Sequence, residues 1–341
     1  MKARTRIIAA IAAGLVLLGG YAGYWFTVAA QLEKGVDDWV ALQRQAGMTV
    51  DFERTSVSGF PFDFRTTFGR PHMAGTIGGQ AFDWHGPDVE AKLSPLDLHA
   101  MTFSGPGHHV IDLGQGPAVV DVADLSARVR LDGFGQLSSL AVKFSGAQAA
   151  LPDGRSLAAA SGEASLDAAA TPPKSEADPL LQFSATAKDL RLPEGTVLLT
   201  ADPLGEVALA GTVKGPMPMA PLRQALASWR DAGGTIEVTD FALAQATLSV
   251  AGSATVALDE TLQPIVAANL KARGLSQTID LLASQRRLHP EDALKMKLFV
   301  KGAERDAPGG YKEVATGLTI QGGYLFWGPF KIARVPPIRW P

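Results

Sequence analysis

The stretch that decides the fold is Ala127-Arg128-Val129-Arg130-Leu131, which is followed after a turn by Leu140-Ala141-Val142-Lys143-Phe144-Ser145. In the first segment apolar side chains alternate with arginines, and in the second the large apolar side chains alternate with smaller or polar ones. Successive side chains of a strand point to opposite faces of a sheet. The two segments therefore predict antiparallel strands with one apolar face and one polar face.

The same two-residue period recurs along most of the chain beyond residue 47, in short segments separated by Gly, Pro and Asp. We expect roughly fourteen strands and about three short helices, near 221–232, 276–286 and 290–300. Aromatic residues are only 7% while glycines number 36 and prolines 22, which suits strands and turns better than a helical bundle. The predicted fold class is mainly β (α+β): an N-terminal transmembrane helix, then an extended, curved antiparallel sheet or a β-sandwich with a few short helices.

Two adjacent prolines in the aperiodic stretch 169–179 predict a linker or a long loop. This stretch divides the β-rich part into an N-terminal β-meander half, 48–168, and a C-terminal half with helices, 180–341.

The N-terminal segment 7–28 carries no charged side chain and is about 22 residues long, which is sufficient to cross a hydrocarbon core of roughly 30 Å. Ile7, Leu15, Leu18 and Trp25 represent its lipid-facing and interfacial side chains. We predict a retained anchor at 7–28, a cytoplasmic tail at 1–6 and a juxtamembrane amphipathic helix at 31–47. A cleavable secretory signal is the alternative, although its apolar region is usually shorter.

The basic residues precede the apolar segment and acidic residues follow it, so we expect the N-terminus in the cytoplasm and the bulk of the chain in the periplasm of a single-pass inner-membrane protein. Cysteine is absent, which is compatible with that compartment. The net charge is −3 with no basic patch, so nucleic acid is not an expected partner.

The ratio of strands to helices limits how the apolar face is covered. One helix covers roughly two strands, so about three helices leave about eight strands uncovered. Those strands curl onto themselves, dock against a second sheet, or keep an open apolar trough that suits acyl chains. The candidate groove residues are Phe62, Phe64, Val129, Leu131, Val142 and Phe144.

Motifs for chemistry are weak in this chain. Five of its six histidines lie between His72 and His109. His85, His99 and His108 would form a metal site only if neighbouring strands placed them on one face, and their spacing matches no metal motif. Since no hydrolase, metalloprotease or phosphate-loop motif occurs, we predict no metal, no cofactor and no catalytic residue.

The segment Ser58-Gly59-Phe60-Pro61-Phe62-Asp63-Phe64, placed after the apolar helix, resembles the opening signature of an uncharacterised domain-of-unknown-function family of single-span envelope proteins common in alphaproteobacteria. The signature residues are Gly59, Phe60, Pro61 and Phe62. The ending, with Leu318 to Tyr324, is similar to that family's terminal hairpin. More distantly, Leu258 to Pro264 and the helix after it resemble the AsmA-like envelope proteins, which are implicated in lipid transport. The first resemblance implies a topology and a compartment but no activity.

Three hypotheses follow. The first is a non-enzymatic, membrane-anchored protein that binds or shields membrane lipid for envelope biogenesis or lipid transport. The second is a structural or partner-binding scaffold with a filled core, whose partners would be other envelope proteins. The third is a membrane-tethered hydrolase with an unrecognised site.

Overall fold

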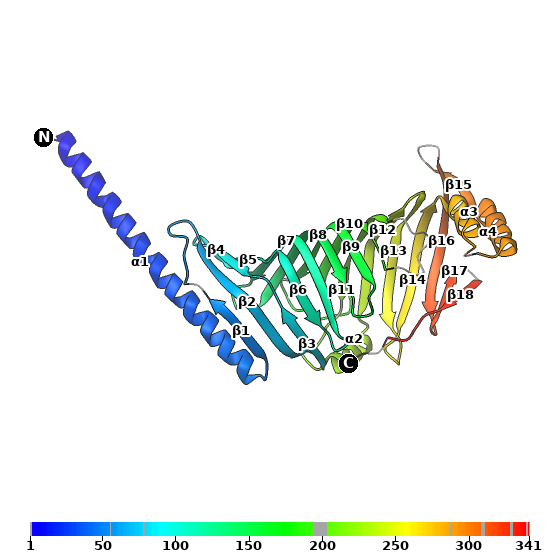
Figure 1. Cartoon of the computed structure of the whole chain (residues 1–341), viewed down its shortest axis with the longest axis horizontal. Coiled ribbons are helices and arrows are strands. Elements are labelled where there is room, and N and C mark those ends of the chain that lie inside the picture. Colours follow the sequence, from blue (N-terminus) through cyan, green and yellow to red (C-terminus); the bar gives the residue numbers. More distant parts are fainter. Residues whose placement is uncertain are drawn as a thin grey trace.

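The computed structural model contains one long antiparallel sheet and a single extended N-terminal helix (Figure 1). It describes residues 2–340 apart from 55, 78, 194–202, 287, 308–310, 328–329 and 339. Within these residues eighteen strands belong to the same sheet, and every pairing between them is antiparallel. The predicted mainly β class is confirmed, and the extended sheet, rather than the sandwich, is the form that it takes.

The helices are α1 (Lys2–Gln45), α2 (Leu222–Asp231), α3 (Leu275–Ser284) and α4 (Pro290–Ala303). The strands, in chain order, are β1 (Thr49–Arg54), β2 (Phe64–Ile77), β3 (Gln80–His85), β4 (Val89–Ser94), β5 (Asp97–Ser104), β6 (Gly107–Asp112), β7 (Pro117–Leu131), β8 (Leu137–Ala150), β9 (Ser156–Ala168), β10 (Pro179–Leu190), β11 (Leu204–Lys214), β12 (Thr235–Gln245), β13 (Leu248–Leu258), β14 (Pro264–Arg273), β15 (Glu304–Ala307), β16 (Tyr311–Gln321), β17 (Tyr324–Trp327) and β18 (Phe330–Arg334).

The sheet is mostly a meander. From β7 to β14 each strand pairs with the next, and the order then continues through β16, β17 and β18. At the other end the long strands β2 and β7 are bridged by two short pairs, β3 with β6 and β4 with β5. The predicted linker 169–179 is the connection between β9 and β10, which pair directly. The two predicted halves are therefore continuous parts of one sheet.

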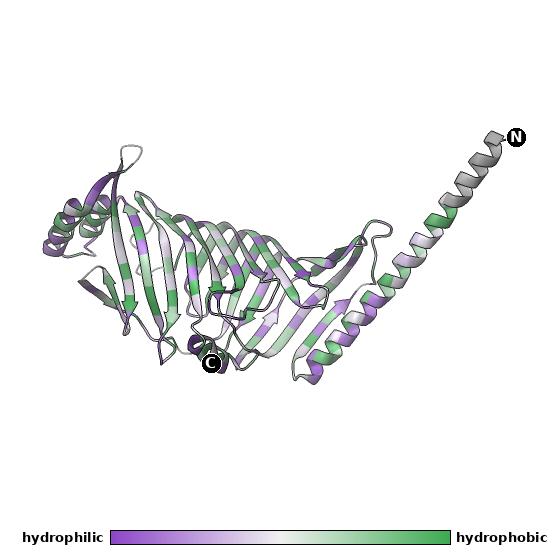
Figure 2. Ribbon diagram, turned by 180° about the vertical axis from the view of Figure 1, so that it is seen from behind, coloured by the Kyte–Doolittle hydropathy of each residue, from purple (hydrophilic) through white to green (hydrophobic). Residues whose placement is uncertain are grey.

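One face of this sheet is apolar across nearly its whole length, and we call it the inner face. Residues directly opposite each other on antiparallel strands share a face, and register connects one apolar row from β2 to β17. The row consists of Phe64, Leu93, Met101, Val129, Leu140, Leu166, Phe183, Gly211, Val238, Ala254, Ala268, Leu318 and Trp327. Figure 2 shows the matching alternation of hydrophobic and hydrophilic residues along the strands.

The opposite, outer face carries polar pairs. Lys143 on β8 contacts Glu163 on β9 at 2.9 Å, and Lys214 contacts Glu237 at 2.7 Å. The hydroxyls of Ser165 and Ser184 lie 2.9 Å apart. The predicted division into a polar and an apolar face is thus present from β8 to β12.

Helix α1 packs against the first end of the inner face and projects away from the sheet beyond it (Figure 1). It joins the predicted anchor and the predicted juxtamembrane helix into one element, and it ends just before Gly47, which has a φ of 84°. Among the described residues α1 contains one segment, Gly14–Gln45, that is long and apolar enough to cross a membrane. Leu15 and Leu18, two predicted anchor residues, are exposed, and Ile7 lies in the helix with its side chain outside the described set.

Trp25, predicted as an interfacial anchor residue, is buried in protein. Its side chain is 3% exposed, its ring stacks on Phe64 with 5.0 Å between centroids, and its indole N–H donates to the carbonyl of Asp63 at 3.2 Å. Val28, Ala29 and Leu93 complete this first core cluster. The contact between α1 and the sheet therefore begins within the predicted membrane segment.

Helices α3 and α4 cover the inner face at the other end. Ile279 of α3 and Val300 of α4 form a second core cluster with Val314 of β16, which lies on an inner-face row with Ala272. The covering helices of both clusters therefore lie on the same side of the sheet.

Phe62 and Phe64, both predicted groove residues, do not lie on the same strand, because β2 begins only at Phe64. Residues 59–63 instead form a tight turn in which the N–H groups of Phe62 and Asp63 donate to the carbonyl of Gly59 at 2.9 and 3.0 Å. Gly59 has a φ of 100°, and a Cβ there would lie 1.9 Å from the Asp63 carboxylate. This turn holds Phe62 in solvent, at 85% exposure.

Candidate functional site

An apolar cavity of about 760 Å³ lies between α1 and the inner face at the first end of the sheet. Its walls come from α1 and from the strands β1 to β7. The lining residues are Gln31, Leu32, Glu33, Gly35, Val36, Trp39, Val50, Phe52, Arg54, Val57, Phe64, Arg65, Thr66, Phe68, Pro71, Met73, Trp84, Val89, Ala91, Leu93, Met101, Phe103, Gly105, His109, Leu125, Ala127 and Leu131. Its volume is within the range of pockets that bind small ligands, roughly 300 to 1,000 Å³.

Three charged side chains of the lining contact other protein groups. Glu33 accepts the backbone N–H of Val57 at 2.9 Å, Arg54 is ion-paired with Asp37 at 2.9 Å, and Arg65 is ion-paired with Asp63 at 3.0 Å, although its Nε atom is buried without a hydrogen bond. Because most of the lining is apolar, the cavity suits an apolar ligand better than a charged one.

His109 is the buried histidine of the cavity wall. Its Nδ1 accepts the indole N–H of Trp84 at 3.2 Å, and its Nε2 lies 2.9 Å from the carbonyl oxygen of Gly105. Both ring nitrogens are therefore used in hydrogen bonds within the protein. His109 is better suited to orienting Trp84 than to acid–base chemistry.

The six predicted groove residues divide into three groups. Phe64 and Leu131 line the cavity. Val129, Val142 and Phe144 lie on inner-face rows next to it, as the pairs Val129 with Leu140, Ala127 with Val142 and Leu125 with Phe144 show. Phe62 is in the 59–63 turn and does not line the cavity.

The sequence analysis did not name several lining residues, although their positions in alternating or helical patterns mark them as apolar-face residues. Phe103 and Met101 on β5 and Trp84 on β3 occupy the apolar positions of alternating segments. Trp39 and Val36 lie on the apolar side of the predicted juxtamembrane helix. What the sequence lacked was the information that this helix lies against β1 to β7.

The inner face continues beyond the cavity and is open to solvent in its middle. Leu166 on β9 is 42% exposed and Leu209 on β11 is 37% exposed. The rings of Phe144 and Phe183 cover glycines of the neighbouring strands, because a Cβ at Gly162 or Gly211 would lie within 2.7 Å of those rings. An apolar path thus leads from the cavity across the strands that follow it.

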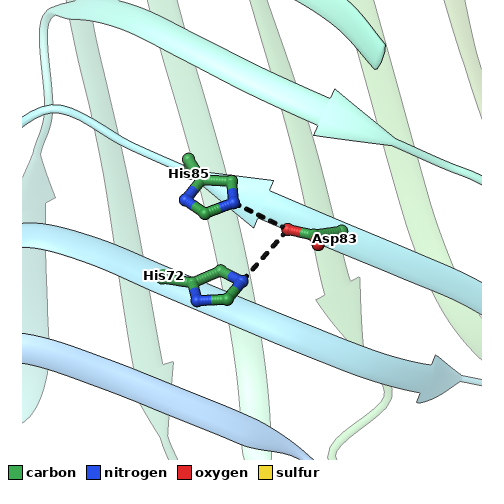
Figure 3. Close-up of side chains that lie close together, drawn as sticks. All are labelled: His72, Asp83 and His85. Atoms are coloured by element: carbon green, nitrogen blue, oxygen red, sulfur yellow. Dashed lines mark hydrogen bonds and ion pairs between the residues drawn. The ribbon is translucent and has the colours of Figure 1, made fainter. Parts of the chain in front are cut away.

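A separate polar cluster lies on the outer face of β2 and β3. His72 and His85 are directly opposite each other, and their rings are stacked with 4.0 Å between centroids. The Nε2 atoms of both histidines lie within 3.2 Å of one carboxylate oxygen of Asp83 (Figure 3).

These three side chains, two imidazoles and a carboxylate, are donors of the type that transition-metal ions use. Of the three histidines considered from the sequence as a conditional metal site, only His85 belongs to this cluster: His99 is on β5 and His108 pairs with Asp121 at 2.9 Å. The two histidines come together because β2 and β3 pair in a register that runs from Ile77 opposite Gln80 to His72 opposite His85. Met73 and Trp84 point to the cavity, so their neighbours His72 and Asp83 are on the opposite face from it.

Comparison with known proteins supplies a family and no described function. No curated protein and no solved structure matches the chain. A family model described as "Uncharacterized protein conserved in bacteria (DUF2125)" matches residues 25–336, which include the cavity, the inner face and the histidine cluster. The chain therefore belongs to the uncharacterised bacterial family DUF2125.

Proposed function

We propose that this protein is a membrane-anchored binding protein that holds lipid acyl chains in the cavity and along the inner face. The observation that carries the proposal is the unbroken apolar row from Phe64 to Trp327, which begins at the cavity and stays partly exposed in its middle. Exposed apolar surface of this extent marks a binding surface in a water-soluble body. Acyl chains are a ligand with matching chemistry and an elongated form.

The anchoring helix supports lipid as the source of those chains. Helix α1 both forms one wall of the cavity and continues into a segment apolar enough to enter a bilayer. The helix that would carry the anchor therefore also lines the proposed binding site. The proposed compartment is the periplasm, with α1 in the inner membrane and its N-terminus in the cytoplasm. The resemblance of residues 258–282 to AsmA-like proteins agrees with a role in envelope lipid transport.

Binding accounts for the site better than the two alternatives. A scaffold with a filled core would bury the middle of the inner face, whereas Leu166 and Leu209 are exposed. A hydrolase would need an acid–base pair facing the ligand, but the His72, Asp83 and His85 cluster lies on the outer face and both nitrogens of His109 are engaged.

Photo-crosslinking in cells tests the proposal. A benzophenone amino acid replaces Phe103 in the cavity, and Thr102, the neighbouring residue on the other face of β5, is the matched control. In cells grown with radiolabelled phosphate, the proposal predicts a phospholipid adduct at position 103 and a signal at least several-fold weaker at position 102. Equal labelling at both positions, or none at position 103, would overturn it.

A further inference from the structure

We infer that three turns around the emerging part of α1 insert into the membrane surface and fix how the sheet stands on the bilayer. These turns, and the beginnings of the strands β5 and β8 that follow two of them, carry the exposed side chains that we call the collar: Phe60, Phe62, Leu96, Leu98, Phe134 and Leu137. Phe62 is 85% exposed, Leu96 is 94% exposed and Phe134 is 92% exposed. Large apolar side chains at such exposure on adjacent turns form a surface that avoids water.

Hydrogen bonds hold two of the turns to α1 at one level of the helix. The hydroxyl of Tyr21 donates to the carbonyl of Pro61, and the hydroxyl of Tyr24 donates to the carbonyl of Pro95 at 2.9 Å. Tyr21 and Tyr24 are one helical turn apart, so the 59–63 turn and the β4–β5 turn both sit beside residues 21–25. Tyrosine, which has an apolar ring and a polar hydroxyl group, is enriched at membrane–water interfaces.

The third turn is next to the second. Val129 of β7 pairs with Met101 of β5, and Met101 pairs with Leu93 of β4. The guanidinium of Arg130 on β7 also forms an ion pair with the carboxylate of Asp97 on β5, at 3.1 Å. The β7–β8 turn with Phe134 and Leu137 is therefore at the same end of these strands as Leu96 and Leu98.

The bilayer is the occupant that the geometry favours. From Ile7 to Phe26 α1 rises roughly 29 Å, which matches a hydrocarbon core of about 30 Å. When the start of α1 spans a bilayer, the collar residues therefore lie at the membrane–water interface on the side of the sheet. Leu15 to Leu18, on the membrane side of the collar, are likewise exposed in the free chain.

The acidic side chains of the turns are each paired with another protein group. Asp63 pairs with Lys92 at 2.8 Å, Asp97 pairs with Arg130, and Asp132 accepts the N–H of Phe134 at 2.8 Å. None of the residues 56–63, 94–98 and 132–137 is lysine or arginine. The inferred contact is therefore hydrophobic insertion into lipid of any headgroup charge, and it differs from electrostatic adsorption to anionic lipid.

This inference rests on the membrane anchoring in the proposed function and is independent of lipid binding along the inner face. The chain has no cysteine, so single cysteines can be labelled without background. The full chain is reconstituted in phosphatidylcholine nanodiscs that contain lipids with a nitroxide near the headgroup end of the acyl chain, at the depth expected for the collar, and lipids with a nitroxide near its methyl end, at the depth expected for residue 17. Separate variants Phe62→Cys, Leu96→Cys and Phe134→Cys carry an environment-sensitive fluorophore.

Two further variants make the result decisive. Leu17→Cys reports whether α1 is in the bilayer. Met219→Cys, at an exposed side chain in the segment after β11 and several strands from α1 along the sheet, reports the fluorescence in water. We expect at least twofold quenching at positions 17, 62, 96 and 134, unchanged at 1 M salt, and none at position 219. Quenching at position 17 alone would overturn the collar while leaving the anchor, and no quenching at position 17 would overturn both. Neither result depends on whether lipid occupies position 103.

Discussion

At the scale of the residue, Asp63 connects the 59–63 turn to the sheet. Its carboxylate lies 2.8 Å from the ammonium of Lys92 and 3.0 Å from the guanidinium of Arg65, and its carbonyl accepts the indole N–H of Trp25. The hydrogen bond from Lys92, followed by that from Arg65, holds the pKa of the Asp63 carboxyl below its ordinary value, against the opposing effect of burial. The charged form of Asp63 therefore stabilises the fold.

Replacement of Asp63 by asparagine tests this role. We expect Asp63→Asn to lower the free energy of unfolding at pH 7 by about 1 to 3 kcal/mol, because hydrogen bonds to charged groups are lost. Since the pKa is lowered on folding, the stabilisation is complete above the unfolded value of about 3.9 and is lost as pH falls through the folded value. The difference between wild type and variant should thus shrink below about pH 4, as measured by urea unfolding followed by tryptophan fluorescence.

Glu163→Gln is the matched control, because Glu163 forms an exposed pair with Lys143 that is worth about 0 to 1 kcal/mol. The role of Asp63 would be contradicted if Asp63→Asn lowered the free energy of unfolding no more than the control does. It would also be contradicted if the difference in free energy between wild type and Asp63→Asn grew toward acid pH.

Single residues were also where sequence reasoning was weakest. The sequence grouped Phe62 with Phe64 as groove residues, but only Phe64 lines the cavity, since Phe62 lies in the turn that begins at Gly59. The position of Trp25 near the end of the apolar segment indicated an interfacial side chain, but its ring stacks on Phe64. Such outcomes depend on contacts between distant segments, which a local pattern does not contain.

At the scale of the element, α3 and α4 close the second end of the inner face through a small set of contacts. Ile279 is 3% exposed and packs with Val300 and Val314. The sequence predicted both helices to within a few residues, because helical spacing marks both and a proline marks the first turn of α4. It did not indicate that they pack on the apolar face rather than on the polar one.

Truncation of Ile279 tests that packing. We expect Ile279→Ala to lower stability by about 2 to 5 kcal/mol locally, since it removes a buried side chain from a small cluster. Amide hydrogen exchange should accelerate in α3 and α4 while β8 to β11 remain protected. Ile265→Ala on β14, where the side chain is 38% exposed, is the control and should leave exchange in α3 and α4 unchanged. Equal acceleration in both variants would show that α3 and α4 do not depend on this cluster.

At the scale of the whole molecule, the sheet is covered by helices at its two ends and keeps an apolar inner face between them. The sequence predicted the alternation and the excess of strands over helices. It could not choose between one long sheet and two packed sheets, because both use the same period of two. That choice depends on which strands pair, and here each strand from β7 to β14 pairs with its neighbour in sequence.

The measurement that tests the central claim most directly is photo-crosslinking along the inner face of the full chain in cells. Benzophenone amino acids replace Leu166, Leu209 and Leu270 on the inner face, and Ser165, Ala210 and Lys271 are the adjacent outer-face controls. The account predicts phospholipid adducts at all three inner positions and at least several-fold weaker signals at the three outer positions. Adducts confined to the cavity at position 103, or equal labelling of both faces, would contradict a continuous lipid-binding face.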